Sequence, residues 1–263
     1  MTETTPLDEA HAAMAAAPED TAARLRFFER LADAELFLLL TEEAQGETIS
    51  PELFTLEEGR FVVAFDREER LATFAGRVAP YAAISGRVLA GMLGGQGVGL
   101  ALNPDVAPSS ILIPAEALAW LTDTLGRAPD EVEAGIAELT APEGLPEALV
   151  SALRARLAQA GGLARAAWLV GVTYRDGGRG HMLAILDAID GAQAPLAKAV
   201  SEALTFSGVD AGALDVTFVA ASDPVAERLA RVGLRFDIPR PKVPEARVIA
   251  APGSDPDKPP ILR

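Results

Sequence analysis

The glycine-rich segment at residues 94–99 (GGQGVG) could do chemistry, because glycine loops at helix N-termini cradle phosphates. A phosphate- or dinucleotide-binding loop follows a strand and opens a helix, so that the helix N-terminus meets the phosphate. Here the order is reversed: a helix is expected at 85–93 and a strand after the loop, and no lysine followed by serine or threonine closes the segment. We therefore interpret it as a tight helix-to-strand turn that needs positive φ angles.

The strand after this loop ends at Asn103-Pro104-Asp105, and loops at strand ends often carry binding groups. Asn and Asp beside proline also start turns by bonding to their own backbone. Two interpretations stay open: a structural turn, or a rim that faces a small ligand and includes Tyr81. The candidate ligand-binding residues are therefore Tyr81, Asn103 and Asp105.

A second glycine turn, RDGGRGH at 175–181, places two arginines and His181 together and could hold an anion. The alternative is an ordinary β-hairpin turn with solvated arginines. Trp120 and Trp168 each lie inside an apolar run, so we predict that both belong to the core.

No set of residues forms a recognisable catalytic constellation. Cysteine is absent, which excludes disulfides, thiolate metal sites and cysteine nucleophiles. The two histidines, His11 and His181, are far apart, and neither accompanies a G-x-S-x-G nucleophile motif. None of the 38 carboxylates forms a pair that stands out. We expect a non-enzymatic protein without catalytic residues, metal site or cofactor.

The net charge of −15 argues against nucleic acid or an anionic membrane as a partner, because phosphates need a basic surface. The charge is uneven: residues 1–126 hold 20 acids against 8 bases, whereas residues 144–263 are almost neutral. This is either a solvated acidic surface or a face for a basic protein partner. The N-terminus lacks a signal-peptide pattern and every apolar run is too short to span a bilayer, so we expect a cytoplasmic protein.

Hydrophobic periodicity predicts an N-terminal α/β domain over 1–126. A helix begins with Thr5 as N-cap and Pro6 at the first helical position. Further helices are expected at 18–33, 66–74, 85–93 and 115–126. Strands are expected at 35–40, 52–56, 61–65 and 81–84, between the glycine turn and Asn103, and at 109–114.

The remainder predicts a linker at 127–145 with a short helical piece, a C-terminal α+β domain at 146–238, and a proline-rich tail at 239–263. The expected order of the C-terminal domain is α-β-β-α-β-α-β. The fold class is therefore α/β (α+β), with two small domains that each pack a mixed sheet against helices. Edge strands and the tail also allow a homo-oligomer.

The N-terminal segments LRFFERLADAELFLLL and ELFTLEEGRFVVAFD and the stretch GGQGVGLALNP…ILIPAEALAWL resemble the N-terminal domain of the enhanced serine sensitivity (SseB) family over about 7–126. The second half is similar in layout to that family's C-terminal domain, including Phe236 to Pro239. The motif residues, which we interpret as structural, are Gly97, Gly99, Leu100, Leu102, Asn103, Pro104, Ile113 and Pro114.

The resemblance implies a cytosolic bacterial protein with a regulatory or accessory role, and it carries over no catalytic residues. We therefore expect a regulatory or adaptor protein that binds a protein partner, with a link to serine or amino-acid metabolism. The alternative is a sensor that binds an amino acid near residues 103–105.

Overall fold

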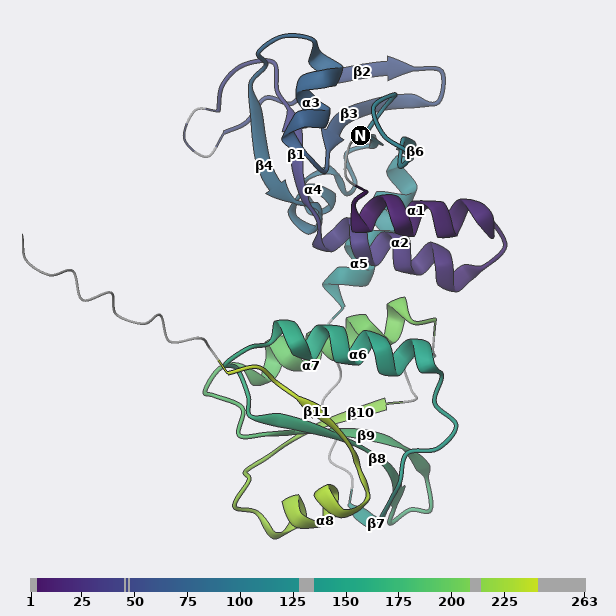
Figure 1. The fold of residues 1–263 in the computed structure, drawn as a ribbon, viewed down its shortest axis with the longest axis vertical. Coiled ribbons are helices and arrows are strands. Elements are labelled where there is room, and N and C mark those ends of the chain that lie inside the picture. The colour runs from purple at the N-terminus through teal and green to yellow at the C-terminus, as the bar shows by residue number, and fades with distance from the viewer. Residues whose placement is uncertain (1–3, 45, 47, 128–134, 209–213, 241–263) are drawn as a thin grey trace, which may run out of the picture.

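The computed structural model describes residues 4–44, 46, 48–127, 135–208 and 214–240. Figure 1 shows two sheet-containing parts, one above the other along the long axis. Both sheets are mixed and both pack against helices, which confirms the predicted α+β class. We call residues 4–127 the N-terminal part and residues 135–240 the C-terminal part.

The sheet of the N-terminal part has the strand order β4-β1-β3-β5-β6, with β2 paired to β3. Only β3 and β5 run parallel. The elements are α1 (Pro6–Ala16), α2 (Thr21–Asp33), β1 (Glu35–Leu39), β2 (Leu53–Leu56), β3 (Gly59–Phe65), α3 (Glu68–Ala75), β4 (Tyr81–Ser85), α4 (Gly86–Leu93), β5 (Val98–Leu102), β6 (Ile111–Ile113) and α5 (Ala115–Gly126).

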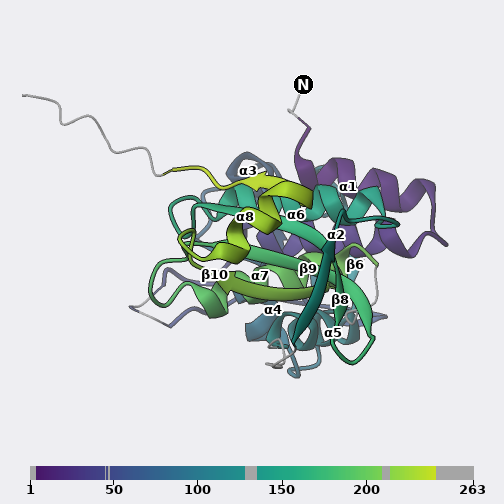
Figure 2. The same cartoon turned by 90° about the horizontal axis from the view of Figure 1, so that it is seen from below.

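The sheet of the C-terminal part has the order β10-β9-β8-β11, with β7 paired to β8. Helices α6 and α7 cover the face toward the N-terminal part, and α8 covers the other face (Figure 1); Figure 2 looks onto α8 from below. The elements are β7 (Ile136–Thr140), α6 (Glu147–Gln159), β8 (Ala166–Tyr174), β9 (Arg179–Leu186), α7 (Gln193–Phe206), β10 (Leu214–Val219), α8 (Pro224–Val232) and β11 (Leu234–Asp237).

The first two helices show how local chemistry sets helix starts. Thr5 caps α1 in a capping box with Asp8, and Pro6 occupies the first turn, as predicted. The predicted start of the second helix at 18 is wrong. The Asp20 side chain accepts a hydrogen bond from the Ala22 N–H, so α2 begins at Thr21.

The predicted linker differs from the structure. Ile136–Thr140 forms β7 and pairs with β8, where a short helical piece was expected. The acidic composition favours a helix locally, but Ile136 and Leu139 pack against the buried cluster around Val170 and Leu229, and that packing decides the outcome. Residues 128–134 of the predicted linker, and the predicted tail from 241 onward, lie outside the described residues.

Neither tryptophan is completely buried. Trp120 is 38% exposed and meets Phe28 and Phe206 edge-on, so it bridges the two parts of the chain. Trp168 is half-buried, with the Arg235 guanidinium 5.7 Å from its ring centroid. The prediction of a core position is therefore wrong for Trp120, whereas Trp168 packs against the buried cluster around Val170 and Leu229. An amphipathic indole suits such half-covered positions.

Candidate functional site

Asn103 and Asp105 are only two positions apart, but the structure places them in different environments. Asn103 is completely buried, with a φ of 47°. Its Oδ1 accepts from the Asp66 N–H at 3.2 Å, and its Nδ2 donates to the Ser109 Oγ at 2.8 Å. Asp105 is exposed, also with a positive φ. The Asn103 side chain is therefore occupied by the protein's own groups and does not face a ligand.

Tyr81 does not join these residues. It lies on β4, and strands β1 and β3 separate it from β5, at whose end Asn103 lies. Its ring packs against Phe37, and a hydrogen bond to Glu68 raises the pKa of its hydroxyl. The three predicted ligand-binding residues therefore do not form one rim, because they belong to non-adjacent strands.

The glycine-rich segment is a turn, as the order of elements predicts. Helix α4 ends at Leu93, Gly95 and Gly97 have φ angles of 76° and 64°, and β5 follows. A Cβ added to Gly99 would lie 2.5 Å from the Phe61 ring and 2.6 Å from the Ile113 carbonyl oxygen. Gly99 thus allows β5 to lie close to its neighbours, and the other motif positions are also structural: Leu100 is buried, and Pro114 is the N-cap residue of α5.

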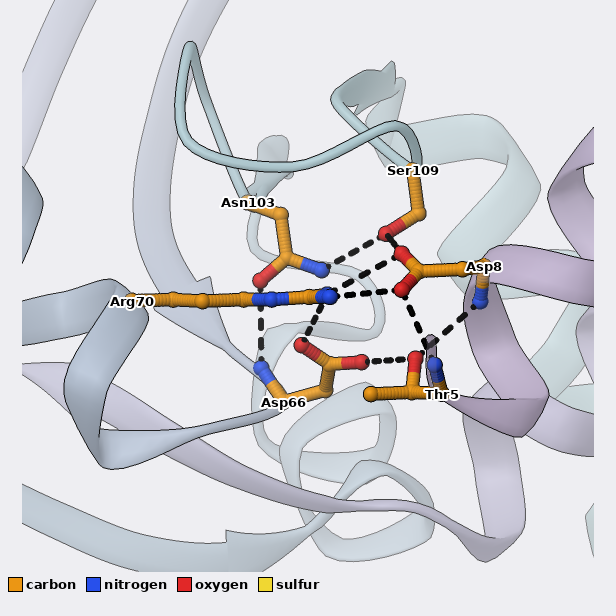
Figure 3. Close-up of polar contacts among 6 residues, drawn as sticks. All are labelled: Thr5, Asp8, Asp66, Arg70, Asn103 and Ser109. Atoms are coloured by element: carbon orange, nitrogen blue, oxygen red, sulfur yellow. Dashed lines mark hydrogen bonds and ion pairs between the residues drawn. The ribbon is translucent and has the colours of Figure 1, made fainter. Parts of the chain in front are cut away.

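Asn103 belongs to a buried polar network that the sequence did not reveal (Figure 3). Arg70 lies at its centre, with Nη1 2.7 Å from Asp66 Oδ1 and 3.0 Å from Asp8 Oδ1. Arg70 and Asp8 are only 2% and 3% exposed. The network, which we call the Asp8 network, consists of Thr5, Asp8, Asp66, Arg70, Asn103 and Ser109.

The Asp8 network connects α1 to α3 and to the loop after β5. Burial alone would raise the pKa of Asp8, but hydrogen bonds from Arg70 and Ser109 outweigh it and hold that pKa well below its ordinary value of 3.8. The carboxylate is therefore ionised and fully bonded. Such a carboxylate stabilises the fold, but its oxygens already accept hydrogen bonds from the protein and are not available for acid–base chemistry. The only buried donor of this network without a hydrogen-bond partner, in the described part of the chain, is the Nε of Arg70.

The arginine-glycine hairpin joins β8 to β9, and Gly177 adopts a φ of 90°. His181 Nε2 lies 2.9 Å from the carbonyl oxygen of Glu143. These observations fit a hairpin turn. Among the residues that the structure describes, no group of three or more histidine, cysteine or carboxylate side chains could hold a metal ion.

One cavity lies between the two parts of the chain. A cavity of about 360 Å³ separates α2 from α6, and we call it the α2–α6 groove. A second cavity of about 370 Å³ shares Arg30, Asp33 and Gln159 with it. The α2–α6 groove is lined by Arg26, Glu29, Arg30, Asp33, Glu147, Ala148, Ser151, Ala152, Ala155, Arg156 and Gln159.

Arg156 is the exceptional residue of this groove. It is 8% exposed, with Nη1 2.7 Å from Asp33 Oδ2 and Nη2 3.3 Å from Glu29 Oε1. Its Nε and Nη2 nevertheless have no hydrogen-bond partner among the described residues. Buried donors without acceptors are costly, at about 1–3 kcal/mol each. Arg156 is therefore charged, buried and incompletely bonded beside a cavity.

The comparisons with known proteins decide the nature of the N-terminal part. Residues 7–120 match the model of the SseB protein N-terminal domain. This part of the chain is an SseB N-terminal domain. No curated protein and no solved structure matches the chain. The likeness of the second half to the C-terminal domain of that family stays a prediction.

The groove lies where the SseB N-terminal domain meets the C-terminal part. Asp33 contacts both Arg156 and, at 3.4 Å, Arg87 of α4. Arg87 in turn binds both carboxylate oxygens of Glu202 on α7, at 2.7 and 2.9 Å. Burial raises the pKa of Glu29, against the effect of the Arg156 charge. A chain of ion pairs through Asp33 and Arg87 thus connects the groove to Glu202 on α7, where the two parts also meet.

A sequence signal for this groove exists, although we did not predict it. Arg26, Glu29, Arg30 and Asp33 recur at helical spacing, so they share one face of α2. Arg156 falls in the apolar repeat of α6, beside the buried Leu149, Leu153 and Leu157. An arginine within an apolar helix face indicates a buried charge that needs a partner.

Replacing Arg87 with glutamine should weaken the contact between the parts. Glu202 is only 6% exposed and would lose its bidentate partner. Because Arg87 itself is about a third exposed, we expect a modest loss, of about 1–2 kcal/mol, in the free energy of unfolding. Differential scanning calorimetry measures the change, with Arg24→Gln on the exposed face of α2 as the control. Equal melting of Arg87→Gln and wild type would contradict the expectation.

Proposed function

We propose that the protein is a non-enzymatic, cytoplasmic regulatory protein that binds a small charged ligand in the α2–α6 groove. The observation that carries this proposal is the cavity between α2 and α6, whose wall holds charges of both signs and includes Arg156, paired there with Asp33 and Glu29. A small charged ligand would find both guanidinium and carboxylate groups in this lining.

Binding is favoured over catalysis by the chemistry of the lining. Arginines, carboxylates, alanines, one glutamine and one serine surround the groove, and its lining contains no histidine, cysteine or lysine. A link to serine or amino-acid metabolism, which the family resemblance implies, is consistent with a small charged ligand. None of the described helices is long and apolar enough to cross a membrane.

The position of the groove supports a regulatory role. The lining comes from α2 of the SseB N-terminal domain and from α6 of the C-terminal part. A ligand held by both helices stabilises one arrangement of the two parts relative to others. Because Asp33 lines the groove and also contacts Arg87, we expect a bound ligand to affect the Arg87–Glu202 ion pair.

An adaptor role for the N-terminal domain is the second candidate. Val88 and Met92 are 52% and 43% exposed and lie one turn apart on α4. Residues 1–126 are strongly acidic, which favours a basic protein partner. Capture of one reproducible partner by the wild type, lost with Met92→Glu but kept with Gln96→Glu, would support this role. Equal capture by both variants would exclude this face.

A thermal-unfolding screen tests the proposed function. The purified full chain is melted with amino acids, small carboxylic acids, amines, phosphate and nucleotides. A ligand at about 100 times its dissociation constant adds roughly 2.7 kcal/mol of stability, a shift of several degrees. We expect at least one such shift, and we expect it to disappear in Ala155→Leu, which fills the groove. Melting that no compound changes would overturn the proposal.

A further inference from the structure

We infer that strand β4 (Tyr81–Ser85) pairs with the same strand of a second copy of this chain, antiparallel across a two-fold axis at Ala83. The two N-terminal sheets then become one continuous sheet. This interface is separate from the α2–α6 groove, and the inference does not depend on the proposed function.

Strand β4 forms an open edge of the N-terminal sheet. Within the described part of the chain, β1 is its one strand neighbour, and Figure 1 shows no helix or strand on its outer side. Ala83 is exposed at the middle of the strand, and Tyr81 is 38% exposed at its start. An open strand edge offers unpaired backbone N–H and C=O groups to another strand.

The hydrogen bonds to β1 show which backbone groups of β4 point outward. Just past the end of β4, the Gly86 N–H donates to the Ala34 carbonyl oxygen, on the β1 side. Because bonded and non-bonded pairs alternate along an antiparallel ladder, the even-numbered residues of β4 bond to β1. The backbone groups of Tyr81, Ala83 and Ser85 therefore point away from the sheet.

Pairing about Ala83 uses all three of these residues. Ala83 then faces the same residue of the second copy, and Tyr81 faces Ser85. Because Ser85 is the N-cap residue of α4, its carbonyl oxygen already accepts within that helix, which leaves about four hydrogen bonds between the copies. The central side chain is a single exposed methyl group, so the two copies meet there without a clash.

The edge carries none of the features by which proteins block such pairing. Residues 78–86 contain no charged side chain, and β4 has no proline and no break in its register with β1. The other sheet edges differ: β2 and β6 have only four and three residues, while β7 contains Glu138, β10 contains Asp215 and β11 contains Arg235. Because the chain has a net charge of −15, two copies approach with least repulsion at an uncharged edge.

Two exposed valines flank β4 and favour a second copy over a different protein. Val78, before the strand, is 99% exposed, and Val88, after it, is 52% exposed. Antiparallel pairing brings the start of the strand in one copy beside the end of the strand in the other. Val78 of each copy then approaches Val88 of the other, and both lose apolar exposure. Arg87 at this end is already paired with Glu202, which compensates its charge where Arg77 of the second copy approaches.

Sedimentation velocity on the full chain tests the pairing. We expect a monomer–dimer equilibrium in which the dimer fraction rises with protein concentration, and no larger species, because a two-fold contact closes on itself. Wild-type protein that stays monomeric up to about 1 mM would overturn the inference, and the edge would then be left to an extended segment of another protein.

A charge at position 83 tests the location of the contact. Ala83→Glu places two carboxylates opposite each other, so we expect dimerisation at least about tenfold weaker than in the wild type. Ala230→Glu makes the same change at an exposed position of α8, in the other part of the chain, and should leave dimerisation unchanged. If Ala83→Glu does not fold, Ala83→Pro replaces it, because the N–H that proline lacks points outward and the ladder with β1 is kept. Undiminished dimerisation of the folded variant would place the contact elsewhere and overturn the inference.

A mixture of two variants tests the two-fold register. Ala83→Lys alone should also dimerise at least about tenfold more weakly, because it places two ammonium groups opposite each other. Mixing it with Ala83→Glu should restore the dimer, since each residue 83 then faces the opposite charge. Such rescue requires residue 83 to face itself across the axis. If both variants fold and their mixture remains monomeric, pairing about Ala83 is wrong.

Discussion

Replacing Asp8 with asparagine should lower the free energy of unfolding by about 3 kcal/mol. The substitution keeps the size of the side chain but removes the charge that faces Arg70, and both residues are nearly inaccessible to solvent. Arg70 would keep only Asp66 as its ionised partner. Ser109 would also lose its charged acceptor. Urea unfolding followed by circular dichroism measures the loss.

Glu9 provides the control for this experiment. It neighbours Asp8 on α1 and is exposed, so Glu9→Gln removes the same charge from the same helix without touching the Asp8 network. We expect a change within about 0.5 kcal/mol for Glu9→Gln. A loss below about 1 kcal/mol for Asp8→Asn would show that the network contributes little to stability.

The pKa of Asp8 adds a dependence on pH. Because its pKa in the folded protein lies below the ordinary value of 3.8, the carboxylate stabilises the fold fully above that value. This stability is lost as the pH falls below about 4 toward the folded pKa. The Asp8→Asn variant should therefore lose less stability than wild type over this acid range. Parallel acid titrations of the two proteins would contradict this.

Replacing Gly86 with alanine should destabilise the protein by at least about 3 kcal/mol. Gly86 opens α4, and its N–H donates to the Ala34 carbonyl oxygen at 2.8 Å. A Cβ there would overlap the carbonyl oxygen of Leu31, which is backbone and cannot rotate away. Helices α2 and α4 must then move apart, and this loosens the packing of the buried cluster that contains Leu31 and Leu89.

Gly91, on the same helix, gives the opposite expectation. It is exposed, and a Cβ added there has no atom within 4 Å. Gly91→Ala should therefore stabilise the protein by about 0.5–1 kcal/mol, because alanine has the higher helix propensity. Chemical unfolding of both variants measures the contrast. If both substitutions are equally tolerated, close approach is not the reason for glycine at 86.

The local features of the fold could be predicted from the sequence because each rests on neighbouring residues. The Thr5-Pro6 helix start, the helix-to-strand turn at Gly97 and the hairpin between β2 and β3 all follow from local spacing. The resemblance of the N-terminal half to the SseB N-terminal domain was likewise visible in its motif and is confirmed over 7–120. Helix caps, turns and hairpins depend on residues that are close together in the sequence.

The candidate site depends on contacts between residues that are far apart in the sequence. Only the tertiary structure shows which of these residues meet. Asn103 looked like a ligand-facing residue, yet its amide bonds to Ser109 and to the backbone of Asp66, 37 positions away. Nothing in the sequence analysis singled out Arg156, because its partners Glu29 and Asp33 lie on a helix of the other part.

The sequence by itself therefore determined the fold class, most elements, the acidic charge and the family of the N-terminal domain. The tertiary structure alone decided that β7 joins the second sheet, that Asp8 is buried with Arg70, and that α2 and α6 enclose a charged groove. The physical reason is that local propensity and periodicity act over a few residues. Whether a charged side chain is buried depends instead on which sequence-distant element packs against it.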